Sequence, residues 1–208
     1  MKKVFKMLAL GLLAGGMMMF TACGDPNGEG EDDPVDQPGD PILLEEGFEN
    51  GAPTDWSYVD ADGDGLGWGT LAALLGQACG QNGSNDCLFS QSYDNQTGVL
   101  YPDNFVITKS VKIPNGHYSL SWGIAAQDPN YPAENYTVYV GTNDNGTFNS
   151  IAQLHTEVVT AKAGTWRTRT VDLKDYAGQT VCFAFRHHDC SDNYFLLLDN
   201  VKVFDNTL

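Results

Sequence analysis

Short runs in which apolar and polar residues alternate restrict this chain to folds built from β-strands. Alternation with a period of two places every second side chain on one face, as in a strand with one buried side. Clusters of Gly, Asn, Asp and Pro separate the runs, as in turns between antiparallel strands. The runs are 118–122, 136–140, 166–173 and 181–187, followed by a mostly apolar run at 195–204. The sequence therefore predicts an all-β sandwich or jelly roll, with one short helix-like segment at 70–75.

The first 22 residues have the features of a bacterial lipoprotein signal peptide. Three lysines precede an apolar run at 7–20, which is shorter than the roughly 20 residues that a membrane-spanning helix needs. Small residues then lead to Cys23 and resemble a lipobox, although Phe20 stands where an aliphatic residue is usual. An ordinary signal peptide followed by a chance cysteine is the alternative. We predict that residues 1–22 are removed and that Cys23 carries lipid.

Residues 23–41 have the composition of a flexible tether. The segment 24–41 holds seven acidic residues, no Lys or Arg, and almost nothing apolar. Such a segment buries too little apolar surface to offset the entropy lost on ordering. Its acids also resemble the surface-export signals of some Gram-negative lipoproteins, and a plain spacer is the alternative. We expect an outer-membrane lipoprotein exposed at the cell surface, and a position facing the periplasm stays open.

Residues 42–208 are long enough to form one domain with a hydrophobic core. Without the signal peptide, 8 basic residues face 27 acidic ones, because three of the 11 bases lie in the signal, and the formal net charge is −19. Phosphate backbones and anionic lipid surfaces repel such a chain. We therefore expect no nucleic-acid partner and no membrane contact except through the lipid anchor.

The segment 60–65 reads Asp-Ala-Asp-Gly-Asp-Gly and carries three carboxylates at alternate positions. Calcium takes several oxygen ligands at short range, and glycines permit the positive φ angles of a loop that wraps around it. The full EF-hand pattern is absent, because Leu71 occupies the position of the bidentate glutamate and no helical pattern flanks the loop. We predict calcium ligation by Asp60, Asp62 and Asp64 in some other fold. A polar surface turn is the alternative.

Four cysteines lie in the predicted domain and would occupy an oxidising compartment. Cys79 and Cys87 flank a loop rich in Gly and Asn that can close freely, which favours a disulfide between them. Cys182 lies in the predicted strand 181–187, where the chain extends by ~3.3 Å per residue and separates it too far from Cys190 for a disulfide. We expect Cys182 to be a small buried apolar residue. A pairing of Cys190 with one of the first two cysteines stays open.

A series of short motifs runs through the predicted domain. They are Phe-Glu-Asn-Gly at 48–51, Asp-Trp at 55–56, the acidic loop at 60–65, Gly-Trp at 67–68, Pro-Asp-Asn-Phe-Val-Ile-Thr at 102–108, Ala-Gln-Asp at 126–128, Asn-Tyr at 130–131, Glu134, Tyr136, and the segments 165–167, 170–173, 183–187 and 197–201. In this order they resemble the cleaved adhesin family, the haemagglutinin/adhesin modules found behind the protease domains of gingipains. The resemblance covers nearly all of 43–204.

The resemblance implies a jelly-roll β-sandwich of the galactose-binding-like type, with calcium-stabilised loops and a role in adhesion to host proteins. It also implies that an acid near the first strand and one in the last strand meet beside the calcium loop. Glu49 and Asp199 match these positions, so we expect them to converge with the three loop acids. Weaker ligand candidates are Asp103, Asn104, Asp128 and Glu134. The chain departs from the family because it carries one module, no protease domain and a lipid anchor. Its binding partner therefore stays open.

The segment 187–190 reads His-His-Asp-Cys and raises the question of a Cys–His nucleophile or a transition-metal site. His187, however, continues a predicted strand, and an oxidised Cys190 would have no reactive thiolate. No Gly-x-Ser-x-Gly motif is present, and the alternating glycines at 63–69 do not form a dinucleotide loop. We therefore expect a binding protein and not an enzyme, and a zinc or haem role for His187 and His188 is the less favoured alternative.

A carbohydrate-binding module is the alternative function, because many jelly rolls that contain calcium bind glycans. Sugar binders of this kind need a flat aromatic platform. The candidates are Trp56, Trp68, Trp122, Tyr131 and Tyr194. Burial of most of these side chains would weaken the carbohydrate hypothesis.

Overall fold

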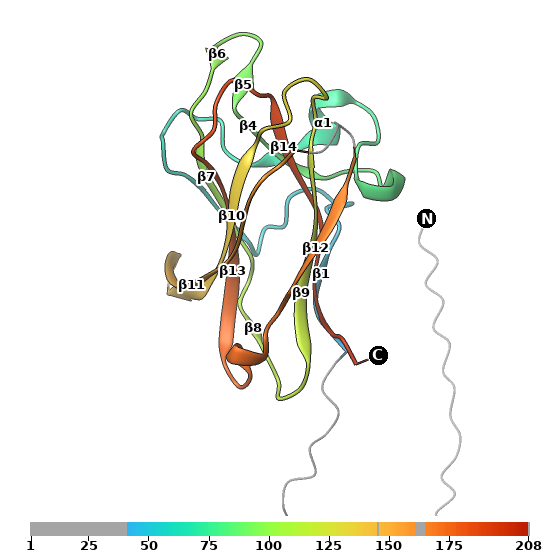
Figure 1. Ribbon diagram of the computed structural model, residues 1–208, viewed down its shortest axis with the longest axis vertical. Helices are drawn as coiled ribbons and strands as arrows, with labels where there is room; N and C mark the ends of the chain where they lie inside the picture. The colour runs from blue at the N-terminus through green and yellow to red at the C-terminus, as the bar shows by residue number, and fades with distance from the viewer. Residues whose placement is uncertain (1–40, 145, 161–164, 208) are drawn as a thin grey trace, which may run out of the picture. The chain divides into compact units, whose positions relative to one another are not determined.

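Two antiparallel sheets, stacked face to face, form the described part of the chain, which in this computed structural model comprises residues 41–144, 146–160 and 165–207 (Figure 1). The all-β jelly-roll prediction is confirmed. Cys23, the predicted signal peptide and the tether up to residue 40 lie outside the described residues. Among the residues that the structure describes, no helix has both the length and the apolar character needed to cross a membrane.

The first sheet has the order β12-β9-β14-β4-β3, and β1 also pairs with β14. Its strands are β1 (Ile42–Glu46), β3 (Gly69–Thr70), β4 (Leu88–Gln91), β9 (Tyr118–Ala126), β12 (Arg167–Asp172) and β14 (Phe195–Asp205). The long strand β14 pairs with β9 along one edge and with β1 and β4 along the other.

The second sheet has the order β11-β10-β13-β7-β2, and β8 also pairs with β13. Its strands are β2 (Ser57–Asp60), β7 (Asp103–Ile107), β8 (Val111–Lys112), β10 (Asn135–Asp144), β11 (Thr147–Val158) and β13 (Thr180–His188). The remaining elements are the hairpin β5 (Tyr93–Asp94) and β6 (Gly98–Val99), the helix α1 (Leu71–Leu75), and the 3₁₀ turns η1 (Gln81–Gly83) and η2 (Lys174–Tyr176).

The strands expected from alternation are all present, as β9, β10, β12, β13 and β14, and the helix-like segment is α1. In β13, Phe183 and Phe185 face the core between the sheets, whereas Cys182 and Ala184 pack on the opposite face with Ile107. Strand β11 was not predicted. It lies at a sheet edge and none of its residues is buried, so its sequence has no clearly apolar face.

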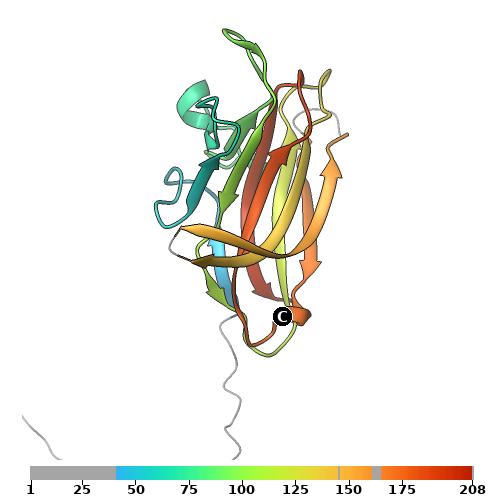
Figure 2. The same cartoon turned by 90° about the vertical axis from the view of Figure 1, so that its left-hand side faces the viewer.

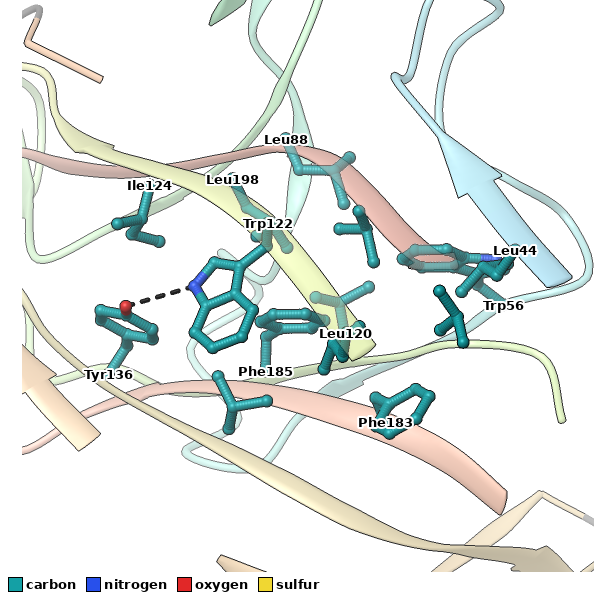
Figure 3. Packing of buried hydrophobic residues seen from close by; sticks show 14 of the residues in the cluster. Leu44, Trp56, Leu88, Leu120, Trp122, Ile124, Tyr136, Phe183, Phe185 and Leu198 are labelled. Atoms are coloured by element: carbon teal, nitrogen blue, oxygen red, sulfur yellow. Dashed lines mark hydrogen bonds between the residues drawn. The ribbon is translucent and has the colours of Figure 1, made fainter. Parts of the chain in front are cut away.

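The core lies between the two sheets and is built around Trp122 of β9 (Figure 3). Its ring meets the ring of Phe185, from the other sheet, edge to face with centroids 5.7 Å apart. The indole N–H donates a hydrogen bond of 3.2 Å to the hydroxyl oxygen of Tyr136. Trp122 thus buries its apolar surface and satisfies its polar atom. Truncating such a residue typically costs ~3–5 kcal/mol.

An ion pair joins the two sheets at one edge. Arg169 of β12 donates two hydrogen bonds to Glu157 of β11, at 2.8 and 2.5 Å. Tyr136 also donates to Glu157 at 3.0 Å, which links this pair to the core. Hydrogen bonding to the guanidinium of Arg169 lowers the pKa of Glu157 to about 2. Because the pair is bidentate and mostly shielded from water, it holds the two sheet edges in one geometry.

The four cysteines of the domain lie in three different surroundings. The sulfur atoms of Cys79 and Cys87 are 3.8 Å apart, across the short loop 79–87. Cys182 is buried within β13, as expected, and its sulfur lies 3.6 Å from the carbonyl oxygen of Gly141. The sulfur of Cys190 instead lies 3.1 Å from Nε2 of His187. The geometry favours the predicted Cys79–Cys87 pair.

We expect protein isolated from the oxidising cell envelope to carry a Cys79–Cys87 disulfide, because a sulfur–sulfur bond of ~2 Å requires only a small movement of the two side chains. Cleavage before Asp86 separates the two cysteines, so mass spectrometry of the non-reduced digest would detect a cross-linked peptide. Cys182→Ser serves as the control and should leave this peptide unchanged. A peptide joining Cys182 to Cys190 would contradict the extended course of β13.

Candidate functional site

The end of β2 and the loop that follows it gather the three acids of the segment 60–65. Asp60 accepts hydrogen bonds from the backbone N–H groups of Gly63 and Gly65, each of 2.8 Å. Both glycines have positive φ angles, 76° and 83°, which other residues rarely adopt. The loop therefore curls, and one carboxylate oxygen from each of Asp60, Asp62 and Asp64 lies within 4.8 Å of the others.

The electrostatics of this acidic loop favour a bound cation. Burial, together with the charges of Asp62 and Asp60, raises the pKa of Asp64. The backbone N–H of Gly65 lowers the pKa of Asp60, which stays ionised. Like charges at this separation repel one another, and the attraction of each carboxylate to a bound cation would outweigh that repulsion. The donors are all oxygens, as calcium requires.

Asp103 supports the acidic loop from β7, and its carboxylate is already engaged by Arg186. Its backbone N–H donates to Asp62 at 2.5 Å. Its carboxylate accepts two hydrogen bonds from Arg186, at 2.6 and 2.9 Å. A bidentate pair of this kind occupies both carboxylate oxygens. Asp103 therefore positions Asp62 and is a poor candidate for direct metal binding.

Asn104 is the better placed of the two weaker candidates on β7. It pairs with Asp60 across β2 and β7. Its side-chain N–H₂ group donates to Ser90 and to the carbonyl oxygen of Leu66. Among the described residues, its Oδ1 is the buried side-chain oxygen that has no hydrogen-bond partner. A buried oxygen without a partner costs ~1–3 kcal/mol of stability. A cation bound at the acidic loop would be a partner for Asn104 Oδ1.

Glu49 and Asp199 meet a different loop, 79–87. Asp199 of β14 is fully buried and accepts hydrogen bonds from the backbone N–H of Gln81, at 2.7 Å, and from the hydroxyl of Ser84, at 3.0 Å. Glu49 accepts from the backbone and side-chain N–H groups of Asn85. Burial raises the pKa of Asp199, and the charge of Glu49 contributes to this rise. The loop 79–87 thus has two carboxylates against it, one buried and one exposed.

The five acids expected to converge are thus divided between two loops. Asp60 ends β2 in the second sheet and Asp62 and Asp64 follow it, whereas Asp199 belongs to β14 in the first sheet. Glu49 and Asp199 contact neighbouring residues of the loop 79–87, Asn85 and Ser84 respectively. The sequence could not show this division, because it depends on which sheet each strand joins.

Three of the five proposed platform aromatics are buried, so that part of the carbohydrate hypothesis is wrong. Trp56, Trp68 and Trp122 are 6%, 8% and 0% exposed. Trp68 packs beside His187, and its N–H donates to the carbonyl oxygen of Asn104. These tryptophans stabilise the fold and are not available to a ligand.

Tyr131 and Tyr194, the other two candidates, line one depression of about 320 Å³. We call it the tyrosine pocket; its residues are Tyr93, Asn95, Asp128, Tyr131, Asp192, Asn193 and Tyr194. Tyr131 is 56% exposed. The rings of Tyr93 and Tyr194 are 6.5 Å apart, and Tyr194 stacks on Phe195 at 4.1 Å. Asp128 caps its own loop by accepting from the N–H of Asn130.

The tyrosine pocket lies at the end of the sandwich opposite the point where the described chain begins. The β5–β6 hairpin, which carries Tyr93 and Asn95, stands at the top of Figure 1, and the C-terminal strand ends at the bottom. Pro41 accepts a backbone hydrogen bond from Asp205 at that lower end. Figure 2 shows the same arrangement from the side.

Glu134, a weaker calcium candidate, lies in a third place. It is fully buried, and its Oε2 lies 3.0 Å from Nε2 of His187 and 3.4 Å from the sulfur of Cys190. His188 points elsewhere, with its Nε2 2.9 Å from the hydroxyl of Thr137. Burial raises the pKa of the Cys190 thiol, so the thiol is not an activated nucleophile. Sequence spacing gave no sign that Glu134 joins these residues.

Comparison with known proteins identifies the family. The Cleaved Adhesin Domain family matches residues 41–203. Gingipain R1 of Porphyromonas gingivalis is 40% identical over 179 residues, which cover 79% of this chain and 10% of that protein. Hemagglutinin A of the same organism is 38% identical over 195 residues, which cover 87% of this chain and 9% of that protein. The chain thus spans about a tenth of the length of these curated relatives.

Solved structures agree on the fold. The K1 cleaved adhesin domain of Lys-gingipain from P. gingivalis W83 has a TM-score of 0.66 and 39% identity, and the match covers 79% of this chain and 98% of that chain. TmCBM61, solved in complex with β-1,4-galactotriose, has a TM-score of 0.52 and 13% identity, covering 77% and 95%. That second likeness concerns the fold alone. The expectation of a non-enzymatic domain is also confirmed, because the matched domain is an adhesin. This chain belongs to the cleaved adhesin domain family.

Proposed function

We propose that this chain is a calcium-stabilised adhesin module at the bacterial cell surface, which binds extracellular host proteins. The observation that carries the proposal is the tyrosine pocket at the end of the sandwich remote from Pro41. A module attached through its N-terminal side would present this end to a partner. Tyrosines and asparagines at the surface are also the residues that recognition loops favour, since they combine rigid apolar area with hydrogen bonding.

A glycan is the second candidate ligand. The tyrosine pocket combines aromatic rings with carboxylate and amide groups, which together suit the apolar faces and hydroxyl groups of sugars. The likeness in fold to TmCBM61 fits this alternative but does not carry it. Burial of the three tryptophans leaves only Tyr131 and Tyr194 of the proposed platform, so we place this candidate second.

Binding assays can locate the ligand site. We expect Tyr131→Ala and Tyr194→Ala to weaken binding by roughly 10-fold or more, as for aromatic anchors in other interfaces. Tyr101→Ala is the matched control, because Tyr101 is 74% exposed and lies outside the tyrosine pocket. Host extracellular proteins and a glycan array would be screened in parallel, with and without calcium. Equal binding by all three variants would rule out the tyrosine pocket as the ligand site.

Calcium is the cofactor that we propose for both oxygen-rich loops. Asp60, Asp62 and Asp64 would hold it at the acidic loop, where Asn104 adds an unpartnered oxygen. A second site would use Asp199 and Glu49, beside the loop 79–87. Bound calcium would supply positive charge that fixes these loops and takes no part in a reaction.

Calcium removal should lower the melting temperature. A ligand that binds only the folded state stabilises it by ~2.7 kcal/mol at a hundredfold excess over its Kd. Calcium should restore the melting temperature after EDTA treatment better than magnesium does, because magnesium demands a tighter octahedral shell. Asp62→Ala and Asp199→Ala should each remove part of the difference. Asp94→Ala, which alters an ordinary exposed turn, should keep it. Identical melting in EDTA and in millimolar calcium would refute the calcium proposal.

Attachment to the outer membrane through Cys23 is the remaining part of the proposal. It is supported by the lipobox-like sequence and the acidic tether, both of which precede the described residues. We expect Cys23→Ala to move the protein from the membrane fraction to the soluble fraction. Protease shaving of intact cells would show whether the wild-type chain faces outward. Unchanged fractionation of the variant would exclude lipidation at Cys23.

A further inference from the structure

We propose that Glu134, His187 and Cys190 form a zinc-binding site that is independent of the calcium loops and of the proposed ligand. The three side chains offer a carboxylate oxygen, an imidazole nitrogen and a sulfur, and one such atom from each lies within 4.8 Å of the others. This mixed donor set differs from the oxygens of the acidic loop. Imidazole and thiolate together suit zinc and are poor ligands for calcium.

The distances between the donor atoms are close to those of a tetrahedral zinc centre. Nε2 of His187 lies 3.0 Å from Oε2 of Glu134 and 3.1 Å from the sulfur of Cys190, and the sulfur lies 3.4 Å from Oε2. Ligands at usual zinc distances and tetrahedral angles are ~3.4–3.6 Å apart. A small outward movement of the three side chains would therefore make room for the ion.

The backbone brings the three ligands together from two elements. His187 is near the end of β13, and Asp189 then adopts a positive φ of 51°, which turns the chain so that Cys190 returns to the same side. Glu134 immediately precedes β10, which pairs with β13. Two ligands thus come from a rigid strand and its adjoining turn, and the third comes from the start of the neighbouring strand.

Neighbouring groups hold the ligands in the orientation that a metal needs. Oε1 of Glu134 accepts hydrogen bonds from the hydroxyl of Ser92, at 3.0 Å, and from the backbone N–H of Tyr194, at 2.8 Å. Its other oxygen is therefore the one that faces His187. Nδ1 of His187 lies 2.8 Å from the hydroxyl of Ser90, which is itself buried. Outer partners of this kind orient the ligands in known zinc sites.

Charge balance and access also fit a zinc ion. A carboxylate and a thiolate would neutralise Zn²⁺, so the buried centre would carry no net charge, whereas an unpaired buried charge is costly. Glu134 and His187 are fully buried, but Cys190 is only partly so. Cys190 borders a depression of about 350 Å³ together with Tyr101, Asp103 and Arg186. The ion and a fourth ligand, water, can reach the site from this side.

The test is zinc binding by the full chain, purified in detergent, kept reduced with a phosphine and saturated with calcium. Competition with a chromophoric chelator would measure the zinc Kd, and mass spectrometry would count bound zinc. We expect one zinc ion per chain. Cys190→Ser should weaken binding by ~100-fold or more, and Ser90→Ala by ~10–100-fold. Replacing zinc with cobalt should give a thiolate charge-transfer band that Cys190→Ser removes.

The controls separate this cluster from other donors. Cys182→Ser and His188→Gln should keep the wild-type affinity, because neither side chain reaches the cluster. The double variant Cys79→Ser/Cys87→Ser should also keep it, which excludes that thiol pair as the site. Circular dichroism would verify that Cys190→Ser is folded. Failure of the wild-type chain to bind micromolar zinc, or unchanged binding by folded Cys190→Ser, would overturn the proposal.

Discussion

The packing of one sheet face against the other is the constraint on which the rest of this structure depends. Trp122 packs between the sheets against Phe185, and its indole N–H donates a hydrogen bond to the hydroxyl of Tyr136. The hydroxyl of Tyr136 donates in turn to Glu157, which also accepts hydrogen bonds from Arg169 of the other sheet. Apolar burial and a single connected polar chain thus fix the spacing of the two layers.

Because the interior is filled by side chains, every candidate site lies at the rim of the sandwich or just beneath it. The acidic loop, the loop 79–87 and the tyrosine pocket all belong to connections between strands. Loops carry few apolar contacts of their own, so their conformation depends on polar groups such as Asp60 and Asp199. The calcium that we propose would order these loops, and a rigid loop loses less entropy when it binds a partner.

The sandwich also tolerates buried polar side chains, and in the described part of the chain all but one of their buried polar atoms have hydrogen-bond partners. Glu134 is fully buried but accepts from Ser92 and from the backbone of Tyr194. Asp199 is held by the backbone of Gln81 in the same manner. Asn104 Oδ1 is the exception among the described buried side chains, and it lies on the strand beside the acidic loop.

The sequence by itself determined five of the strands, β9, β10, β12, β13 and β14, and the acidic loop, since these depend on neighbouring residues. Alternation in 181–187 placed Phe183 and Phe185 in the core, and the glycines of 60–65 allowed three acids to curl inward. The sequence did not show which distant segments pair, because strand order and sheet membership arise from packing of the whole chain. For that reason only the tertiary structure shows that Asp199 lies away from the acidic loop and that Trp68 is buried. The same packing brought Glu134, 53 residues away in sequence, to within hydrogen-bonding distance of His187.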